Sequence, residues 1–257
     1  MNTDKIRIIA FYTFKEIFKS KILLNVFFAG LGLMLLTYVA TEFTYGVPER
    51  VALDIGLGML SISSLAISLF LGVGLLSKEI DSRTVYMVIA RPVHRSSFIV
   101  GKLIGLMGIQ AINVFLLSLM TLGMTKFLGG EISLLIIWSI GFVFLESLML
   151  LLVVVLMSLL ANNILTALIS IVILLLGHAV KETQNISFVE MNPGLKSVLE
   201  FYHFILPGFY KLNLKDFILY NSFLPTEYLL SSLLYGITYS GFLLCFIIFI
   251  FNRKNLD

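Results

Sequence analysis

Six long, uninterrupted apolar segments limit what this chain can fold into. They are Ile22–Thr41, Ile55–Leu76, Leu103–Met124, Ile132–Leu160, Ile164–Val180 and Tyr228–Phe251. A helix rises about 1.5 Å per residue, so about 20 residues cross the roughly 30 Å hydrocarbon core of a bilayer. The segments do not alternate apolar and polar residues as barrel strands do. The sequence therefore predicts an all-α, polytopic membrane protein with six transmembrane helices.

Composition agrees with a bilayer as the surrounding solvent. Apolar residues make up 59% of the 257 residues and charged residues make up 13%, whereas a soluble domain carries about 25% charged residues. No stretch is polar enough to form a separate soluble domain. We therefore expect one membrane domain over residues 1–257.

The distribution of Lys and Arg predicts which ends of the helices face the cytoplasm. With the N-terminus inside, twelve of the 18 basic residues fall in inner segments and six in outer segments, in agreement with the positive-inside rule. The inner residues are Lys5, Arg7, Lys15, Lys19, Lys21, Lys78, Arg83, Arg91, Arg95, Lys102, Arg253 and Lys254, and the outer ones are Arg50, Lys126, Lys181, Lys196, Lys211 and Lys215. Both termini are then cytoplasmic, in a multi-pass protein of the cytoplasmic (inner) membrane.

Residues 1–21 precede the first crossing and have the pattern of an amphipathic helix. Apolar side chains recur at helical spacing on one face and charged side chains fall on the other. The apolar positions are Ile6, Ile9, Ala10, Phe14, Ile17 and Phe18, and the charged ones are Asp4, Lys5, Lys15, Glu16 and Lys19. We expect this helix to lie along the inner membrane surface, where its basic groups meet anionic lipid heads. The alternative is a basic flank that only sets the topology.

The segment 77–101 joins the second and third crossings on the inside and is unusually apolar for a connection. An apolar run from Val85 to Ala90 lies between charged residues. One interpretation is a cytoplasmic helix that ends near Pro92, because proline disfavours helix at the preceding residue, with an apolar patch that faces a partner. The other is a continuation of the second crossing. The residues leave both interpretations open.

The segment 181–227 lies outside and is expected to contain short helices at the outer face. Asn192-Pro193 resembles a helix cap followed by proline at the first helical position. Pro207-Gly208 ends the apolar stripe that follows, and a second apolar piece spans Leu214–Tyr220. These helices would cap an outward exit or form a surface lid without function.

The chain carries no sequence signature of an enzyme. It has no GxxxxGK[ST] nucleotide loop. Its three histidines, His94, His178 and His203, lie on different segments and indicate neither a metal site nor a catalytic triad. The single cysteine, Cys245, is expected to be buried and inert in its apolar run. We expect no metal or other cofactor on this chain, and no nucleic acid as a partner.

Glu146 is a charged residue at the centre of the predicted crossing Ile132–Leu160. An ionised carboxylate at that depth costs about 2.5–3.5 kcal/mol on insertion scales. It should therefore face other helices or a wet cavity, or be protonated. One interpretation is a contact for substrate or proton, and the other is an interhelical hydrogen bond, for example with Ser118 or Ser139.

The inner segment carries an ordered set of short motifs. They are Lys78-Glu79, Arg83-Thr84, Ala90-Arg91-Pro92-Val93-His94-Arg95 and Gly101-Lys102. Their order resembles the type-2 permease family of ABC transporters, which shows a glutamate, Gly-Thr, Ser-Arg-Pro-(Val/Ile)-x-Arg and Gly-Lys before the third crossing. Arg83 and Ala90 stand where that family has glycine and serine. The amphipathic N-terminal helix, the six crossings and the long outer segment extend the resemblance over the whole chain.

The resemblance implies a permease subunit that exports an unidentified substrate while a separate ATPase subunit hydrolyses ATP. Two permeases, expected to be identical, would bind two copies of the ATPase, which hold ATP and Mg. The segment 77–101 would be the coupling segment. Its expected ATPase contacts are Glu79, Thr84, Arg91, Pro92, Arg95, Gly101 and Lys102.

Two other functions are compatible with the sequence. A proton-coupled secondary carrier would use Glu146, although carriers often show inverted repeats and the sequence shows none clearly. A non-transporting membrane module would let an ATPase act on an outer partner through the segment 181–227.

Overall fold

The computed structural model describes residues 3–19, 22–43, 47–81, 94–184, 206–219 and 224–253. Helix accounts for 90% of these residues and they include no strand, which confirms the all-α class. The helices are α1 (Thr3–Phe18), α2 (Ile22–Glu42), α3 (Pro48–Asp81), α5 (Arg95–Phe127), α6 (Leu134–Leu160), α7 (Asn163–Gln184), the short 3-10 helix η1 (Phe209–Leu212), α10 (Lys215–Leu219) and α11 (Thr226–Arg253).

Within the described ranges, four helices are long and apolar enough to cross a membrane. They are the Pro48–Val73 part of α3 together with α5, α6 and α11. Shorter apolar stretches lie on α2 (Val26–Glu42) and α7 (Asn163–Ala179). A multi-pass membrane protein fits these helices, and six crossings remain a prediction.

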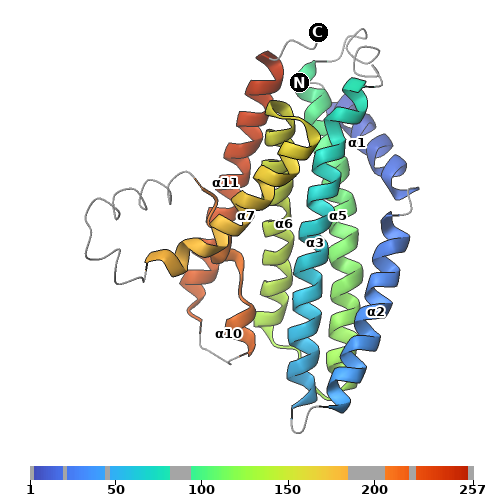
Figure 1. Ribbon diagram of the computed structural model, residues 1–257, viewed down its shortest axis with the longest axis vertical. Coiled ribbons are helices and arrows are strands. Elements are labelled where there is room, and N and C mark those ends of the chain that lie inside the picture. Colours follow the sequence, from blue (N-terminus) through green and yellow to red (C-terminus); the bar gives the residue numbers. More distant parts are fainter. Residues whose placement is uncertain are drawn as a thin grey trace.

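The bundle is built around α6. In the most apolar stretch of α6, 72% of the residues are buried, against 17% in α11. Helix α6 packs against α3 on one side and α11 on the other, and α3 also packs against α5. Helix α7 runs obliquely across this bundle (Figure 1). Helix α6 is apolar on nearly all sides. A helix of this kind is stable when protein or lipid surrounds it.

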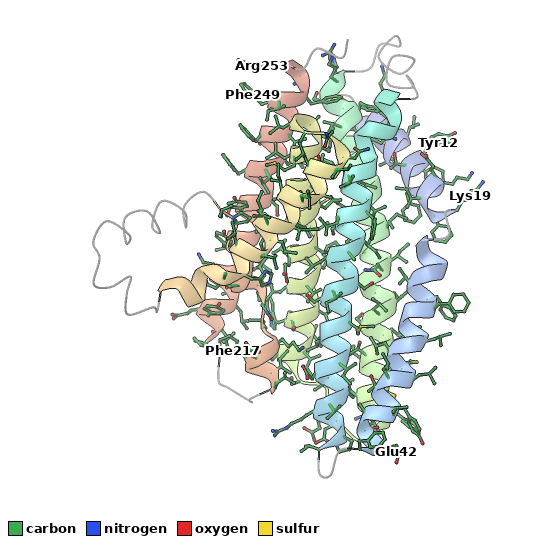
Figure 2. All side chains as sticks on the ribbon, viewed as in Figure 1. Tyr12, Lys19, Glu42, Phe217, Phe249 and Arg253 are labelled. Atoms are coloured by element: carbon green, nitrogen blue, oxygen red, sulfur yellow. The ribbon has the colours of Figure 1, made fainter. Side chains whose placement is uncertain are left out.

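The helix termini lie in two groups, one at each end of the bundle. The start of α1, the end of α3, the start of α5 and the end of α11 lie at one end (Figure 1). Arg253, the last residue of α11, lies there, whereas Glu42 at the end of α2 lies at the opposite end (Figure 2). Helix α3 therefore ends, and α5 begins, beside the start of α1 and the end of α11 (Figure 1).

Helix α1 packs along the first half of α5. Two glycines of α5 make room for it: a Cβ at Gly101 would lie 2.9 Å from the Cβ of Ile9, and a Cβ at Gly105 would lie 2.7 Å from the Cβ of Thr13. The predicted apolar face of α1 therefore contacts protein, which removes part of it from contact with lipid. Tyr12 and Lys19 point away from the bundle (Figure 2), and Tyr12 is 65% exposed.

Large apolar side chains cover the outside of the bundle. Leu35 on α2, Phe70 on α3 and Ile164 on α7 are 68%, 79% and 74% exposed. A protein in water rarely exposes so much contiguous apolar surface, so this surface suits hydrocarbon. Cys245 is also exposed on α11. The expectation of a buried thiol was wrong, because α11 lies at the edge of the bundle.

The helices extend further into the inner segment than the sequence predicted. Helix α3 continues to Asp81 and α5 begins at Arg95. Both ends of the segment 77–101 are therefore helical, and residues 82–93 between them lie outside the described part. The cytoplasmic helix expected near Pro92 lies outside the described residues, so the choice between it and a longer second crossing stays open.

Candidate functional site

Glu146 lies near the middle of α6 and is only 2% exposed. Its Oε1 atom is 3.1 Å from Nε2 of His178 on α7. The two atoms are close enough for an ion pair, although Oε1 makes no hydrogen bond of good angular geometry. A carboxylate inside an apolar bundle is stable only when it is paired or protonated. The contact with His178 therefore explains how a carboxylate can be buried at this position.

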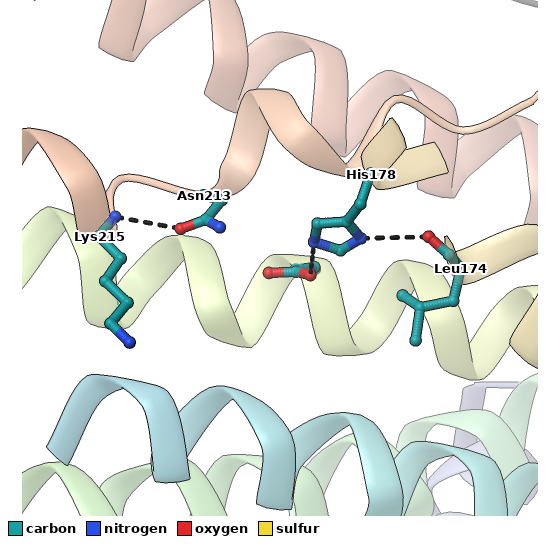
Figure 3. A network of polar contacts seen from close by, with 5 residues as sticks. Leu174, His178, Asn213 and Lys215 are labelled. Carbon is teal, nitrogen blue, oxygen red and sulfur yellow. Dashed lines mark hydrogen bonds and ion pairs between the residues drawn. The ribbon is translucent and has the colours of Figure 1, made fainter. Parts of the chain in front are cut away.

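His178 is held from three sides. Its Nδ1 atom is 3.1 Å from the carbonyl oxygen of Leu174, one turn earlier on α7. In Figure 3 the ring lies between that carbonyl and an unlabelled carboxylate; its Nε2 atom makes the contact with Oε1 of Glu146. The ring also stacks on Phe209, with 5.8 Å between ring centroids and 14° between planes. About a third of the His178 side chain, 34%, is still exposed.

The partner of Glu146 differs from the serines that the sequence suggested. Ser118 donates its hydroxyl to the Phe115 carbonyl within its own helix, while Glu146 meets His178. Sequence reasoning missed His178 because it treated the three histidines as too far apart to cooperate. The available signal was that His178 lies inside the predicted crossing Ile164–Val180, where an ionisable side chain indicates a functional site.

The chain from Pro207 to Leu214, here called the plug segment, covers the pair. Phe209 and Leu212 are fully buried and Leu214 is 1% exposed, and η1 contacts α6, α7 and α11. A Cβ at Gly177 of α7 would collide with the carbonyl oxygen of Pro207. The glycine before His178 therefore allows the plug segment to lie directly against α7.

Polar contacts hold the plug segment at its two ends. The backbone N–H of Gly208 donates to the Tyr235 hydroxyl on α11 at 2.7 Å, and Nζ of Lys211 lies 4.3 Å from the centre of the Tyr235 ring. Beyond the segment, Lys215 of α10 pairs with Asp54 of α3 at 2.7 Å. The backbone N–H of Lys215 also donates to the side chain of Asn213 (Figure 3).

A second polar group of residues lies in the interior between α3, α5 and α6. Gln110 donates to the Ser64 carbonyl at 3.0 Å and Asn113 donates to the Ser64 hydroxyl at 3.2 Å. Ser68 donates to the Ser147 carbonyl at 2.7 Å. Hydrogen bonds of this kind join helices in a bilayer. The sequence analysis did not single these residues out, although Gln110 and Asn113 stand inside a predicted crossing.

Some of the predicted ATPase contacts lie among the residues that the structure describes, and others do not. Arg95, Gly101 and Lys102 lie on the first turns of α5, where Gly101 seats α1 and the Lys102 ammonium lies 5.8 Å from the centre of the Phe98 ring. Glu79 lies on the last turn of α3, and its side chain is outside the described part. Thr84, Arg91 and Pro92 are outside the described residues altogether. The helices bring the flanks of the motif to one end of the bundle.

An apolar cavity of about 490 Å³ lies between α6 and α11. Its wall includes Trp138 and Phe142 of α6 and Leu233 and Ile237 of α11, and the remaining lining residues are also apolar or glycine. It offers hydrocarbon contacts and no charged group. Such a wall distinguishes poorly between apolar ligands.

The chain matches no protein-family model and no curated protein. Among the described residues, no group of three His, Cys, Asp or Glu side chains is arranged to hold a metal ion. The features that bear on function are therefore the motif, the arrangement of the helices and the Glu146–His178 pair.

Proposed function

We propose that the chain is the membrane-spanning permease subunit of an ABC transporter. It would cross the cytoplasmic membrane six times, with α2 and α7 as the two shorter crossings and both termini in the cytoplasm. The amphipathic helix α1 would lie at the inner surface. A separate ATPase subunit would supply the energy, and a second copy of the chain would complete the export path.

The observation that carries the proposal is the ordered motif of residues 78–102. The fold supports the proposal because the last turn of α3 and the first turn of α5 lie at the same end of the bundle as the start of α1 and the last turn of α11 (Figure 1). Helix α1 packs beside Gly101. A partner that docks at this end would therefore meet α1 and the motif together, as a coupling surface requires.

The number of crossings is supported by the short apolar stretches on α2 and α7. Both stretches are followed or preceded by polar residues, and both helices expose large apolar side chains such as Leu35 and Leu175. Six crossings also place most basic residues on the same side. A bundle of only four crossings would leave these two apolar helices at the membrane surface or in water.

Co-purification tests the proposal. The full-length chain is purified in detergent from its native membrane, and nucleotide-hydrolysing proteins that accompany it are identified. Arg91→Glu reverses a charge in the coupling motif. Arg50→Glu is the matched control, because Arg50 is exposed at the start of α3 at the other end of the bundle. We expect wild type and Arg50→Glu to retain an ATPase subunit and Arg91→Glu to lose it.

Two outcomes would count against this proposal. Absence of an ATPase subunit from every preparation contradicts the permease assignment. Equal recovery with Arg91→Glu contradicts the role of the motif as the docking site.

A proton-coupled carrier is the second candidate, and the burial of Glu146 beside His178 favours it. A carrier would transport without ATP and stop when the proton gradient is removed. Transport that continues in Glu146→Gln would count against it, because the amide cannot take up and release the proton.

A further inference from the structure

The contacts of His178 determine how many protons the Glu146–His178 pair holds. Nδ1 of His178 lies 3.1 Å from the carbonyl oxygen of Leu174, and a carbonyl oxygen only accepts hydrogen bonds. Nδ1 therefore carries a hydrogen. A neutral imidazole carries hydrogen on only one ring nitrogen, so Nε2 of a neutral His178 presents a lone pair to Glu146.

A lone pair at Nε2 is incompatible with an ionised Glu146 in the observed position. The two acceptor atoms would face each other at 3.1 Å. Oε1 is buried and makes no hydrogen bond of good angular geometry. Burying an acceptor or a charge without a partner is strongly unfavourable. The contact is stable when one proton lies between Nε2 and Oε1, as imidazolium with carboxylate or as imidazole with carboxylic acid.

The position of His178 connects this proton to the plug segment. The imidazole ring stacks on Phe209, which is fully buried at the centre of the segment. Gly177, the neighbour of His178, lies directly under Pro207 and Phe209. A movement of His178 away from an unprotonated carboxylate would therefore remove the surface on which Phe209 rests.

We infer that Glu146 and His178 form a proton-binding site whose single shared proton keeps the plug segment Pro207–Leu214 seated against α7. Release sends that proton to water past the exposed edge of His178, and leaves a carboxylate and a neutral imidazole that repel each other. The pair then separates and the segment loosens. This inference is independent of the ABC-transporter proposal, because it needs neither an ATPase nor a cargo.

Other titratable groups occur on the elements packed around the pair, and their effect has to be separated from that of the shared proton. They are Lys181 and Glu182 on α7, Tyr210 and Lys211 on η1, Glu227, Tyr228, Tyr235, Tyr239, Cys245 and Arg253 on α11, Lys215 and Asp216 on α10, and Glu49, Arg50, Asp54, Lys78, Glu79 and Asp81 on α3. Glu146→Gln separates them, because its amide donates an N–H to Nε2 of a neutral His178 and accepts from an imidazolium through its oxygen, while all these groups stay in place.

Thiol labelling of the plug segment in the full-length chain in lipid nanodiscs tests the inference. Cys245→Ser removes the native exposed thiol. Leu212→Cys then reports a fully buried position, and Asp216→Cys reports an exposed position just beyond the segment. Dividing the first labelling rate by the second removes the pH dependence that the two thiols share, and the same ratio measured with Glu146→Gln accounts for any difference between them. We expect this ratio to rise about tenfold or more with pH as the buried acceptors lose their shared proton, and to stay low and constant when Glu146→Gln is added.

A constant ratio in the otherwise native chain, or an equal rise with Glu146→Gln, overturns the inference. Because Leu212→Cys removes part of a buried side chain, ring-nitrogen NMR of histidine-labelled protein without cysteine substitutions provides a second measurement. His178→Asn identifies the His178 signals among the three histidines. A hydrogen on Nδ1 at neutral pH supports the inference, and a neutral ring with its hydrogen on Nε2 contradicts it.

Discussion

His178 reaches across from α7 to place Nε2 3.1 Å from Oε1 of Glu146 on α6. Helix α6 is the most deeply buried of the four long apolar helices, and the plug segment packs over the same place. The pair therefore joins α7 to the central helix α6 beneath the plug segment, inside apolar surroundings.

Loss of the Glu146 carboxylate should destabilise the fold strongly. Glu146→Ala leaves His178 without its partner, and because about a third of the His178 side chain is exposed we expect a cost of about 1–3 kcal/mol, that of a polar group left unsatisfied. Glu146→Gln should lose much less of the unfolding free energy, because its amide N–H donates to Nε2. Unfolding in mixed micelles, followed by circular dichroism, gives both values. Equal losses for the two variants would contradict the pairing.

The Lys215–Asp54 pair should contribute far less. Both side chains are partly exposed, 33% for Lys215 and 50% for Asp54, and exposed ion pairs are typically worth about 0–1 kcal/mol. Asp54→Asn should therefore change the unfolding free energy by less than about 1 kcal/mol, with a smaller effect at high salt. A loss as large as that of Glu146→Ala would show that Asp54 is more than a surface partner.

Gly177→Ala should disturb the seating of the plug segment. The added Cβ collides with the backbone oxygen of Pro207, and backbone cannot yield as the end of a flexible side chain can. We expect a loss of about 1–3 kcal/mol in unfolding free energy, the usual cost of overpacking. The matched control is Gly241→Ala on α11, where the added Cβ meets nothing within 4 Å. Similar results for the two variants would show that the contact between α7 and Pro207 is unimportant.

Reporter fusions distinguish six crossings from four. If α2 and α7 both cross, fusions after residue 45 and after residue 195 report outside, while fusions after residues 87 and 161 and at the C-terminus report inside. If α2 lies on the surface, the N-terminus and residue 45 report the same side. That result would overturn the predicted topology and the inner position of the motif with it.

The sequence predicted the helices well and their contacts poorly. Long apolar runs give the helices because a backbone in hydrocarbon must satisfy its own hydrogen bonds, and the structure extends them by a few residues at polar ends, as in α3 and α5. Hydrophobicity does not say which face of an apolar helix meets protein and which meets lipid. For this reason Cys245 was assigned to the interior, and the seating of α1 at Gly101 and Gly105 was not foreseen.

The sequence also did not predict which polar side chains pair with one another inside the bundle. Glu146 was recognisable as a costly intramembrane charge. Its pairing with His178 depends on how α7 crosses α6, and the cover over it depends on the contact of the plug segment with α7. The hydrogen bonds of Ser64 with Gln110 and Asn113 likewise join helices whose register no local pattern determines.

The rate of ATP hydrolysis tests the central claim most directly. The ATPase subunit that co-purifies with the chain is assayed alone, with the wild-type chain and with Arg91→Glu, each reconstituted in lipid vesicles. Our account predicts that the wild-type chain changes the hydrolysis rate and that Arg91→Glu leaves it at the rate of the ATPase alone. The same rate in all three samples, or the absence of any ATPase partner, would contradict it.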